Sequence, residues 1–271
     1  MKRLGLCFSG GGARGAYQVG VSKALDELGY FEQVYAFSGT SIGSVNASLL
    51  ATKPIEEVKD IWVKFPKEEV KFVESLMKKI RTREFSIVKK GVTDIKSLEK
   101  MLDEKLEHEK LREKLVFITL SPAGLTDEGT LGILKSSFKH YIRGENKVIY
   151  SPLHKQKSKD INKQIIASCS IPFIFPPVNL DGKQFFDGGL YDNIPIKPLV
   201  DAGCDTIIIV NLQRLLRYNP KKFPGIKLIE IKHKKSLGAV LNFENNQAQI
   251  RYDLGYEDAM NYFKENPLEL K

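Results

Sequence analysis

Short apolar runs and amphipathic stretches alternate from the first residues of the chain. The apolar runs predict buried strands, and the stretches with apolar positions at helical spacing predict helices. Strand, turn and helix follow one another twice, over residues 3–9, 10–12, 13–28, 34–38, 39–43 and 44–51. Gly29 predicts the stop of the first helix. This order is typical of a parallel sheet flanked by helices.

The rest of the chain continues the α/β pattern and adds a charged helical stretch. Later strands are predicted at residues 114–120, 206–212 and 226–232, and later helices at 161–168, 196–202 and 243–264. The pattern of residues 54–113 is helical and carries many charges of both signs. No internal repeat and no linker rich in Gly, Ser or Pro divides the sequence. We therefore predict one α/β domain over residues 1–271, with a helical insertion at about 54–113.

The composition is that of an ordinary globular protein. The 271 residues are 42% hydrophobic and 28% charged, which excludes disorder throughout and a collagen-like repeat. No apolar run reaches the ~18 residues of a membrane span, and the first residues do not form a secretory signal. Cys7, Cys169 and Cys204 are widely spaced in apolar or small-residue runs, which favours reduced core thiols over disulfides or a zinc site. We expect a cytoplasmic protein.

The net charge of +9 is concentrated in two segments. Residues 135–163 hold eight basic against two acidic residues, and residues 214–235 hold eight against one. Such patches favour a polyanion, either nucleic acid or the anionic headgroups of a membrane, and a solvated basic surface stays an alternative. No zinc-finger spacing, RNP motif or basic-plus-heptad pattern supports nucleic acid.

A basic amphipathic segment lies inside the charged stretch, at residues 76–92. Its apolar side chains alternate with lysines and arginines, which suits a helix that lies on a membrane or covers a cleft. A surface helix that packs its apolar stripe on the sheet is the other interpretation.

The first group of residues with chemical potential is Gly10-Gly11-Gly12-Ala13-Arg14-Gly15, between a predicted strand and helix. Glycines there let the chain turn with exposed amides at a helix N-terminus, where negative charge is stabilised. The loop fits either a dinucleotide site or an oxyanion hole. A dinucleotide site expects an acidic residue at the end of the next strand, and that strand ends in Ser-Gly-Thr.

The second group is Gly39-Thr40-Ser41-Ile42-Gly43, which matches G-x-S-x-G between a predicted strand and helix. In that context the flanking glycines permit the sharp turn of a nucleophile elbow, with the Ser41 hydroxyl exposed. An ordinary Gly/Ser turn is the alternative. Because the carboxyl ends of neighbouring parallel strands meet at one edge, we expect Ser41 to lie beside the first glycine loop.

A nucleophilic serine needs a base, and the sequence offers two candidates. A Ser-Asp-His order permits only His233, which lies in a lysine-dense segment that we expect to face solvent. Asp187 ends an apolar run and precedes Gly188 and Gly189. Burial beside aromatic residues would raise its pKa and make it a better base near neutral pH, although a turn aspartate is the simpler interpretation.

Together these groups resemble the patatin-like phospholipases, lipid acyl hydrolases with a Ser-Asp dyad. The resemblance runs in order over residues 2–212, with supporting blocks at 167–177 and 187–195. It implies a three-layer α/β fold with a mainly parallel central sheet. It also implies roles for individual residues: Ser41 as nucleophile, Asp187 as general base, Gly10, Gly11 and Gly12 as the oxyanion hole, and Arg14, Gly15, Gly39, Gly43, Gly188 and Gly189 as supporting residues.

The resemblance implies hydrolysis of a lipid or fatty-acyl ester through an acyl-enzyme. No cluster of His, Cys and carboxylates has metal-ligand spacing, so we expect no metal and no cofactor. The basic segments would then hold the protein at the periphery of an anionic membrane, with no nucleic-acid partner. A nucleotide-dependent oxidoreductase, a triad hydrolase that uses His233 and a non-enzymatic protein of the same fold stay open as alternatives.

Overall fold

The computed structural model describes residues 2–64, 92–123, 148–172, 175–240 and 242–269. Its strands are β1 (Leu4–Phe8), β2 (Val34–Gly39), β3 (Leu115–Pro122), β4 (Ile149–Pro152), β5 (Val178–Leu180), β6 (Lys183–Asp187), β7 (Thr206–Asn211) and β8 (Lys227–Lys232). Its α-helices are α1 (Ala16–Glu27), α2 (Ile42–Leu50), α3 (Ile55–Val63), α5 (Val92–Lys105), α6 (His108–Arg112), α8 (Ser158–Ser168), α9 (Lys197–Asp201) and α10 (Asn245–Glu265).

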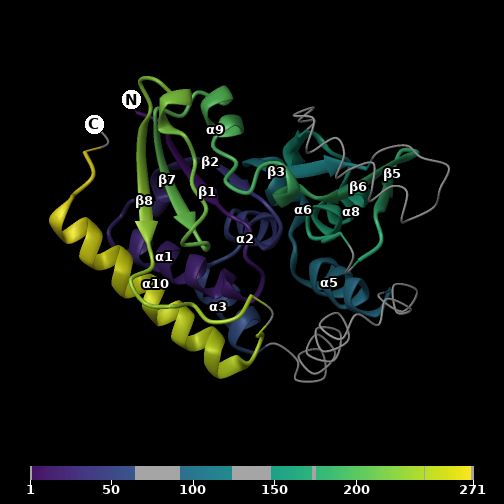
Figure 1. Ribbon diagram of the computed structural model, residues 1–271, viewed down its shortest axis with the longest axis horizontal. Helices are drawn as coiled ribbons and strands as arrows, with labels where there is room; N and C mark the ends of the chain where they lie inside the picture. Colours follow the sequence, from purple (N-terminus) through teal and green to yellow (C-terminus); the bar gives the residue numbers. More distant parts are fainter. Residues whose placement is uncertain (1, 65–91, 124–147, 173–174, 241, 270–271) are drawn as a thin grey trace.

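The eight strands form one mixed sheet in the order β5-β6-β3-β2-β1-β7-β8, with β4 also paired to β3. The five strands from β3 to β8 along this order are parallel, whereas β4 and β6 pair antiparallel with β3, and β5 with β6. Figure 1 shows β5 and β6 at the opposite end of the molecule from β8 and α10. The mainly parallel sheet is confirmed, but the sequence pattern did not predict the three short antiparallel strands.

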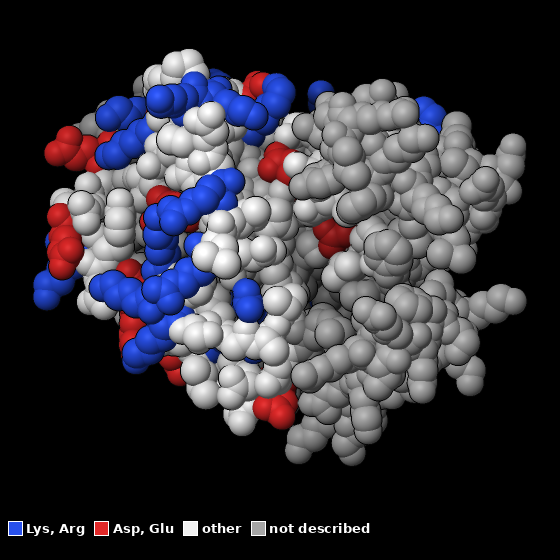
Figure 2. Space-filling view, in the orientation of Figure 1, with Lys and Arg blue, Asp and Glu red and all other residues white. Residues whose placement is uncertain are grey.

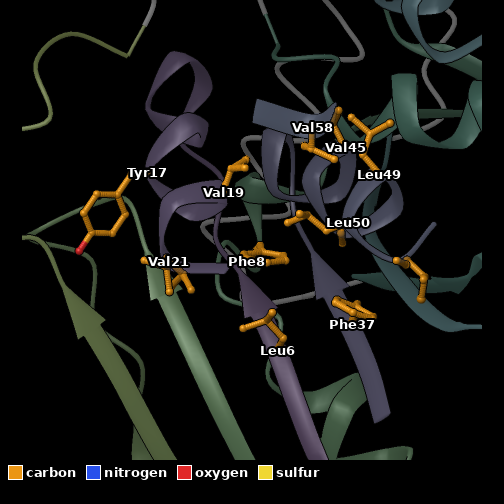
Figure 3. Close-up of a cluster of buried hydrophobic side chains, with 14 of the residues drawn as sticks. Leu6, Phe8, Tyr17, Val19, Val21, Phe37, Val45, Leu49, Leu50 and Val58 are labelled. Carbon is orange, nitrogen blue, oxygen red and sulfur yellow. The ribbon is translucent and has the colours of Figure 1, made fainter. Parts of the chain in front are cut away.

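Alternate residues of the central strands enter two cores on opposite faces of the sheet. On β1, Leu6 and Phe8 join the larger cluster, and Cys7 between them joins the smaller one. The larger cluster packs against α1, α2, α3, α8 and α10, and the smaller one against α9 and the loop before β8. Figure 3 shows Leu6, Phe8 and Phe37 of the strands beside helix residues of the larger cluster, with Val45, Leu49 and Leu50 labelled on α2. Helices thus cover both faces, which confirms the layered α/β fold.

Helices α1 and α10 cross so closely that only glycine fits at the contact. A Cβ on Gly20 would lie 1.9 Å from the carbonyl oxygen of Tyr252, and a Cβ on Gly255 would lie 2.1 Å from that of Tyr17. The two helices lie side by side in Figure 1, against the half of the sheet that contains β1, β7 and β8. This contact fixes the C-terminal helix against the first helix of the chain.

Within the charged stretch at 54–113, the described residues consist mostly of the helices α3, α5 and α6, with short non-helical segments at their ends. It is anchored to the core: Val58 and Trp62 of α3, Leu102 of α5 and Leu111 of α6 are all buried. The basic amphipathic segment 76–92 falls almost entirely outside the described residues. No helix among the described residues is long and apolar enough to cross a membrane.

Substituting Gly255 by Ala should destabilise the protein by roughly 1–3 kcal/mol, because the added methyl group forces α1 and α10 apart. This cost exceeds the ~1 kcal/mol that alanine gains over glycine in helix propensity. Urea unfolding measures the difference. Glu257→Ala, at an exposed position two residues further along α10, is the control and should change stability by less than about 0.5 kcal/mol. Equal stability of the two variants would contradict the packing argument.

Candidate active site

Ser41 lies in a strained turn between β2 and α2. Its φ is 56° and its ψ −129°, a backbone conformation that L side chains rarely adopt. The turn is too tight for side chains on either side: a Cβ on Gly39 would lie 2.1 Å from the carbonyl oxygen of Gly43, and a Cβ on Gly43 would lie 2.3 Å from that of Phe8. The predicted elbow geometry is therefore present, and it depends on both glycines.

Hydrogen bonds from the surrounding elements hold this turn in place. The Ser41 amide donates to the Oγ of Ser168, the last residue of α8, at 3.0 Å. The Thr40 hydroxyl lies 2.7 Å from the Oγ1 of Thr119 on β3 and donates to the Asp192 carbonyl at 3.0 Å. The strained conformation is thus supported from α8, from β3 and from the segment after β6.

Asp187 is the last residue of β6 and pairs with Leu120 of β3. Strand β3 lies between β6 and β2, the strand that leads into the Ser41 turn. The Asp187 carboxylate accepts a hydrogen bond from the Ser41 hydroxyl and another from the Gly189 amide at 2.7 Å. Burial raises the pKa of Asp187 to about 6, and the two hydrogen bonds oppose that rise. The rise that the sequence predicted is confirmed, and a carboxylate with this pKa is a competent base near neutral pH.

The glycine loop after β1 touches the serine turn. A Cβ on Gly10 would lie 3.1 Å from the Cβ of Ser41 and 2.4 Å from the Oδ1 of Asn193. The Gly10 amide donates to the Asn193 carbonyl at 3.3 Å, and the Asn193 side-chain amide donates to the Gly10 carbonyl at 3.2 Å. Asn193 follows the Asp187 block, so it ties this block to the glycine loop.

Two amides of the loop have no hydrogen-bond partner among the described residues. The Ala13 amide donates to the Val240 carbonyl at 2.6 Å, and the Arg14 amide donates to the Gly11 carbonyl at 3.3 Å. With the Gly10 amide also in use, only those of Gly11 and Gly12 are available to an incoming anion. Of the three glycines expected to bind an oxyanion, Gly10 has its amide occupied by the Asn193 carbonyl in this geometry.

Arg14 points away from the loop amides and fastens the loop to the C-terminal part of the chain. Its Nε donates to the Gly238 carbonyl at 2.9 Å, and its Nη1 donates to the Leu212 carbonyl at 3.2 Å. A Cβ on Gly12, whose φ is +56°, would lie 2.3 Å from the Val240 carbonyl oxygen. The segment around Gly238 and Val240 thus forms one wall of the glycine loop.

A second arginine, Arg251 of α10, is only 1% exposed and holds the same wall. It donates four hydrogen bonds to the backbone carbonyls of Leu237, Ala13, Asn242 and Ala239, at 2.8, 2.9, 2.6 and 3.2 Å. Burial, and secondarily the charge of Arg14, lowers the pKa of Arg251 to about 10. Arg251 was not predictable from the sequence, because nothing in its local pattern distinguishes it from a surface arginine on a helix.

A buried polar network lies beneath the loop. Asn46 of α2 donates to the Gln18 side chain and to the Gly15 carbonyl, each at 2.9 Å, and accepts from the Trp62 indole at 3.0 Å. Gln18 in turn donates to the Ser9 carbonyl at 2.8 Å. A Cβ on Gly15 would lie 2.5 Å from the Trp62 ring, so Gly15 is required where α3 packs on the loop.

His233 does not reach the serine. It follows β8, three strands from β2 in the sheet, which places it roughly 14 Å away at the usual strand spacing. It is 8% exposed, so the expectation that it faces solvent is wrong. Its ring packs edge-on against Tyr17 with centroids 6.0 Å apart, and its Nδ1 donates to the Lys235 carbonyl at 2.8 Å.

The three cysteines are free thiols: Cys7 and Cys204 are buried, and Cys169 is partly buried. Among the residues that the structure describes, no group of three or more His, Cys, Asp or Glu side chains is placed to hold a metal ion.

Comparison with known proteins gives these features a context. The sequence profile of a family described as patatin-like phospholipase matches residues 6–200. Lysophospholipase NTE1 of Cryptococcus neoformans is 24% identical over 230 residues, which cover 82% of this chain and 12% of that protein. Triacylglycerol lipase 4 of Saccharomyces cerevisiae is 26% identical over 296 residues, which cover 94% of this chain and 30% of that protein.

Two further similarities concern a bacterial relative and a solved structure. An uncharacterized NTE family protein of Mycobacterium tuberculosis is 28% identical over 214 residues, 78% of this chain and 49% of that protein. This chain therefore spans less than half of each of the three sequence relatives. The crystal structure of VipD from Legionella pneumophila has the same fold, with a TM-score of 0.52 at 14% identity, over 97% of this chain and 67% of VipD.

The matched profile covers most of the chain, and it contains the glycine loop, the Ser41 turn and the Asp187 block. The similarity to VipD extends the shared fold beyond the profile, to almost the whole chain. On these grounds the chain belongs to the patatin-like phospholipase family.

Proposed function

We propose that this protein hydrolyses carboxylic ester bonds of lipids through an acyl-enzyme on Ser41, with Asp187 as the general base. The observation that carries the proposal is the hydrogen bond from the Ser41 hydroxyl to the buried Asp187 carboxylate, at a strained turn. The names of the relatives, a lysophospholipase and a triacylglycerol lipase, support a lipid ester as substrate. Their two substrate classes differ, so we propose only an ester-linked acyl lipid.

In the first step, the ionised Asp187 takes the proton of the Ser41 hydroxyl while the serine oxygen attacks the ester carbonyl carbon. The carbonyl oxygen gains negative charge, which the free amides of Gly11 and Gly12 are placed to stabilise. The alcohol then leaves with the proton that Asp187 holds. Water resolves the acyl-enzyme by the same route: Asp187 takes a water proton and returns it to Ser41, and the fatty acid leaves.

The remaining loop residues support this chemistry without touching the ester. Arg14 and Arg251 hold the loop through backbone carbonyls, and their charges add a positive field near the developing oxyanion. Gly188 and Gly189 follow the base: a Cβ on Gly188 would lie 2.4 Å from the Thr119 carbonyl oxygen. Gly188 is therefore required by its close approach to β3, and Gly189 donates its amide hydrogen bond to the Asp187 carboxylate.

The competing functions have less support. A dinucleotide site would leave the hydrogen bond between Ser41 and Asp187 without a purpose, and β2 ends in Ser38 and Gly39, with no carboxylate for a ribose. A triad with His233 requires a contact across three strands. A non-enzymatic protein of this fold would have no need to bury an ionisable carboxylate against a strained serine.

We further propose that the protein acts at the surface of membranes, as a peripheral cytoplasmic protein held by its basic segments. Part of the 135–163 segment falls outside the described residues. In the 214–235 segment, the basic side chains of Arg214, Arg217, Lys221, Lys222, Lys227, Lys232, Lys234 and Lys235 are exposed. An anionic membrane would attract those of them that face it.

Ser41→Ala and Asp187→Asn should each lower kcat for p-nitrophenyl esters by about 10³-fold or more, because one removes the nucleophile and the other the base. Labelling of Ser41 by a fluorophosphonate should be lost in the first variant and slowed in the second. His233→Ala is the control and should keep the wild-type kcat. Full activity of Asp187→Asn would reject the base assignment. A wild-type protein that is inert toward esters and fluorophosphonate alike would favour the binding-protein alternative.

The pH profile of kcat/KM should show an acid limb with its midpoint at about pH 6, because the base works only when Asp187 is ionised. Below that pH the rate should fall tenfold per pH unit, and from there to about pH 8 it should be flat. Initial rates on a soluble short-chain ester measure the profile. The midpoint should be the same in His233→Ala. A midpoint near pH 4 would mean that Asp187 is not the base, or that burial does not shift its pKa.

Arg251→Met should lower kcat on a soluble ester by about tenfold or more and leave KM within twofold. The reason is that the Gly11 and Gly12 amides act on the transition state, and Arg251 positions the wall against which they rest. Circular dichroism and thermal unfolding establish whether the variant is folded, and Arg251→Lys, which keeps the charge and part of the hydrogen bonding, should recover part of kcat. A folded Arg251→Met with wild-type kcat would show that the arginine serves stability alone.

A further inference from the structure

A rigid turn after β7 presents a leucine to solvent. Leu215 is 92% exposed at the tip of this turn, where the Leu216 amide donates back to the Gln213 carbonyl at 3.2 Å. The Asn211 side chain closes the base of the turn: its Oδ1 accepts from the Gln213 amide at 3.0 Å, and its Nδ2 donates to the Leu216 carbonyl at 3.1 Å. Leu215 is therefore held outward by an ordered backbone.

The turn adjoins the glycine loop. Because β7 is parallel to β1 and pairs with it, both strands end at the same edge of the sheet. Leu212, at the start of the turn, packs against Gly11, where an added Cβ would lie 2.6 Å from the Leu212 Cβ. Val240 is 37% exposed and belongs to the wall of the loop. Both exposed apolar side chains therefore flank the loop beside Ser41.

Five exposed basic side chains lie at the same edge of the sheet as the leucine. Arg214 and Arg217 stand on either side of it in the sequence, and Lys232, Lys234 and Lys235 come from the end of β8 at the same edge. Of these five, only Lys232 makes an ion pair within the described part of the chain, with Glu230 at 3.5 Å. Figure 2 shows lysine and arginine side chains gathered on the face of the molecule that carries β7, β8 and α10.

The adjoining cavity accounts for only part of these charges. It has a volume of about 430 Å³ between the end of β8 and α10, and Arg214, Lys232 and Lys234 line it together with Glu230, Asp258 and Glu265. Acidic and basic side chains balance inside it, so it is a poor site for an anion. Arg217 and Lys235 are not among the residues that line it, and the described part of the chain holds no ion pair for either of them.

We propose that this edge docks on an anionic lipid bilayer, with Leu215 inserted among the acyl chains and the five basic residues on the headgroups. The proposal rests on the proposed function, since a bilayer holds the ester that Ser41 would attack. An exposed leucine that shares one edge with exposed cations suits a bilayer, which offers hydrocarbon beneath anionic charge. Nucleic acid offers the negative charge without the hydrocarbon.

Docking in this orientation brings the catalytic residues to the membrane. The glycine loop and Ser41 lie at the same edge as Leu215, so a lipid drawn from the bilayer reaches the serine without crossing the protein. Each basic residue near an anionic surface strengthens binding about fivefold, and insertion of a leucine adds about tenfold or more. These contributions are large enough to measure one variant at a time.

The test is sedimentation with vesicles of phosphatidylcholine alone, or mixed three to one with phosphatidylglycerol. Arg214→Ser/Arg217→Ser should weaken binding to the mixed vesicles about 25-fold, and Leu215→Ser about tenfold. The matched control is Lys2→Ser/Lys227→Ser, which removes two exposed lysines at the amino ends of β1 and β8, the opposite edge of the sheet. This control should lose less than threefold. All variants should hydrolyse a soluble short-chain ester at the wild-type rate.

The outcomes separate the docking proposal from the proposed function. Equal losses in the two double variants would mean that net charge alone attracts the protein, and would overturn the docking edge. So would unchanged binding of Leu215→Ser, or equally tight binding of the wild type to both kinds of vesicle. Inactivity on the soluble ester, with the binding pattern intact, would instead refute the proposed function, and the binding assay can be repeated in Ser41→Ala, where catalysis plays no part.

Discussion

The site depends on backbone packed against backbone at the ends of β1 and β2. A side chain on Gly43 would clash with the carbonyl of Phe8, and a side chain on Gly39 would clash with the carbonyl of Gly43. Gly10 lies so close to Ser41 that a side chain there would also be crowded. No side chain can enter this junction, so the two strand ends come close enough for a loop of amides to face a serine hydroxyl. The strain at Ser41 is possible because α8, β3 and the segment after β6 fix the turn from outside.

The region that completes the site lies beyond the part of the chain that the family profile matches. The profile ends at residue 200, yet the glycine loop is walled by the segment that contains Gly238 and Val240, and that wall is fastened by Arg251. The glycine contact between α1 and α10 then fixes Arg251 relative to the loop. A unit defined by the profile alone would lack one wall of its glycine loop.

The elements that position the serine were predictable because their signals are local. An apolar run followed by glycines specifies β1 and its loop, and the same pattern specifies β2 and the Ser41 turn. Features that depend on distant partners were not predictable in this way. Strands β4 and β6 are short and form by pairing with β3, and β5 forms by pairing with β6. His233 is buried because Tyr17 of α1 packs against it. The Gly10 amide is occupied because Asn193, which follows β6 in the chain, lies beside it.

One residue beneath the site has a practical consequence. Trp62 is the single tryptophan of the chain, and it packs on Gly15, donates to Asn46 and stacks on Phe243 with the ring planes 4° apart. Its indole is 7% exposed. The tryptophan fluorescence of the protein, excited selectively over that of the tyrosines, therefore arises from one place, under the glycine loop. Any ligand that displaces the loop would change the surroundings of this one fluorophore, so the protein carries its own optical reporter of binding at this loop.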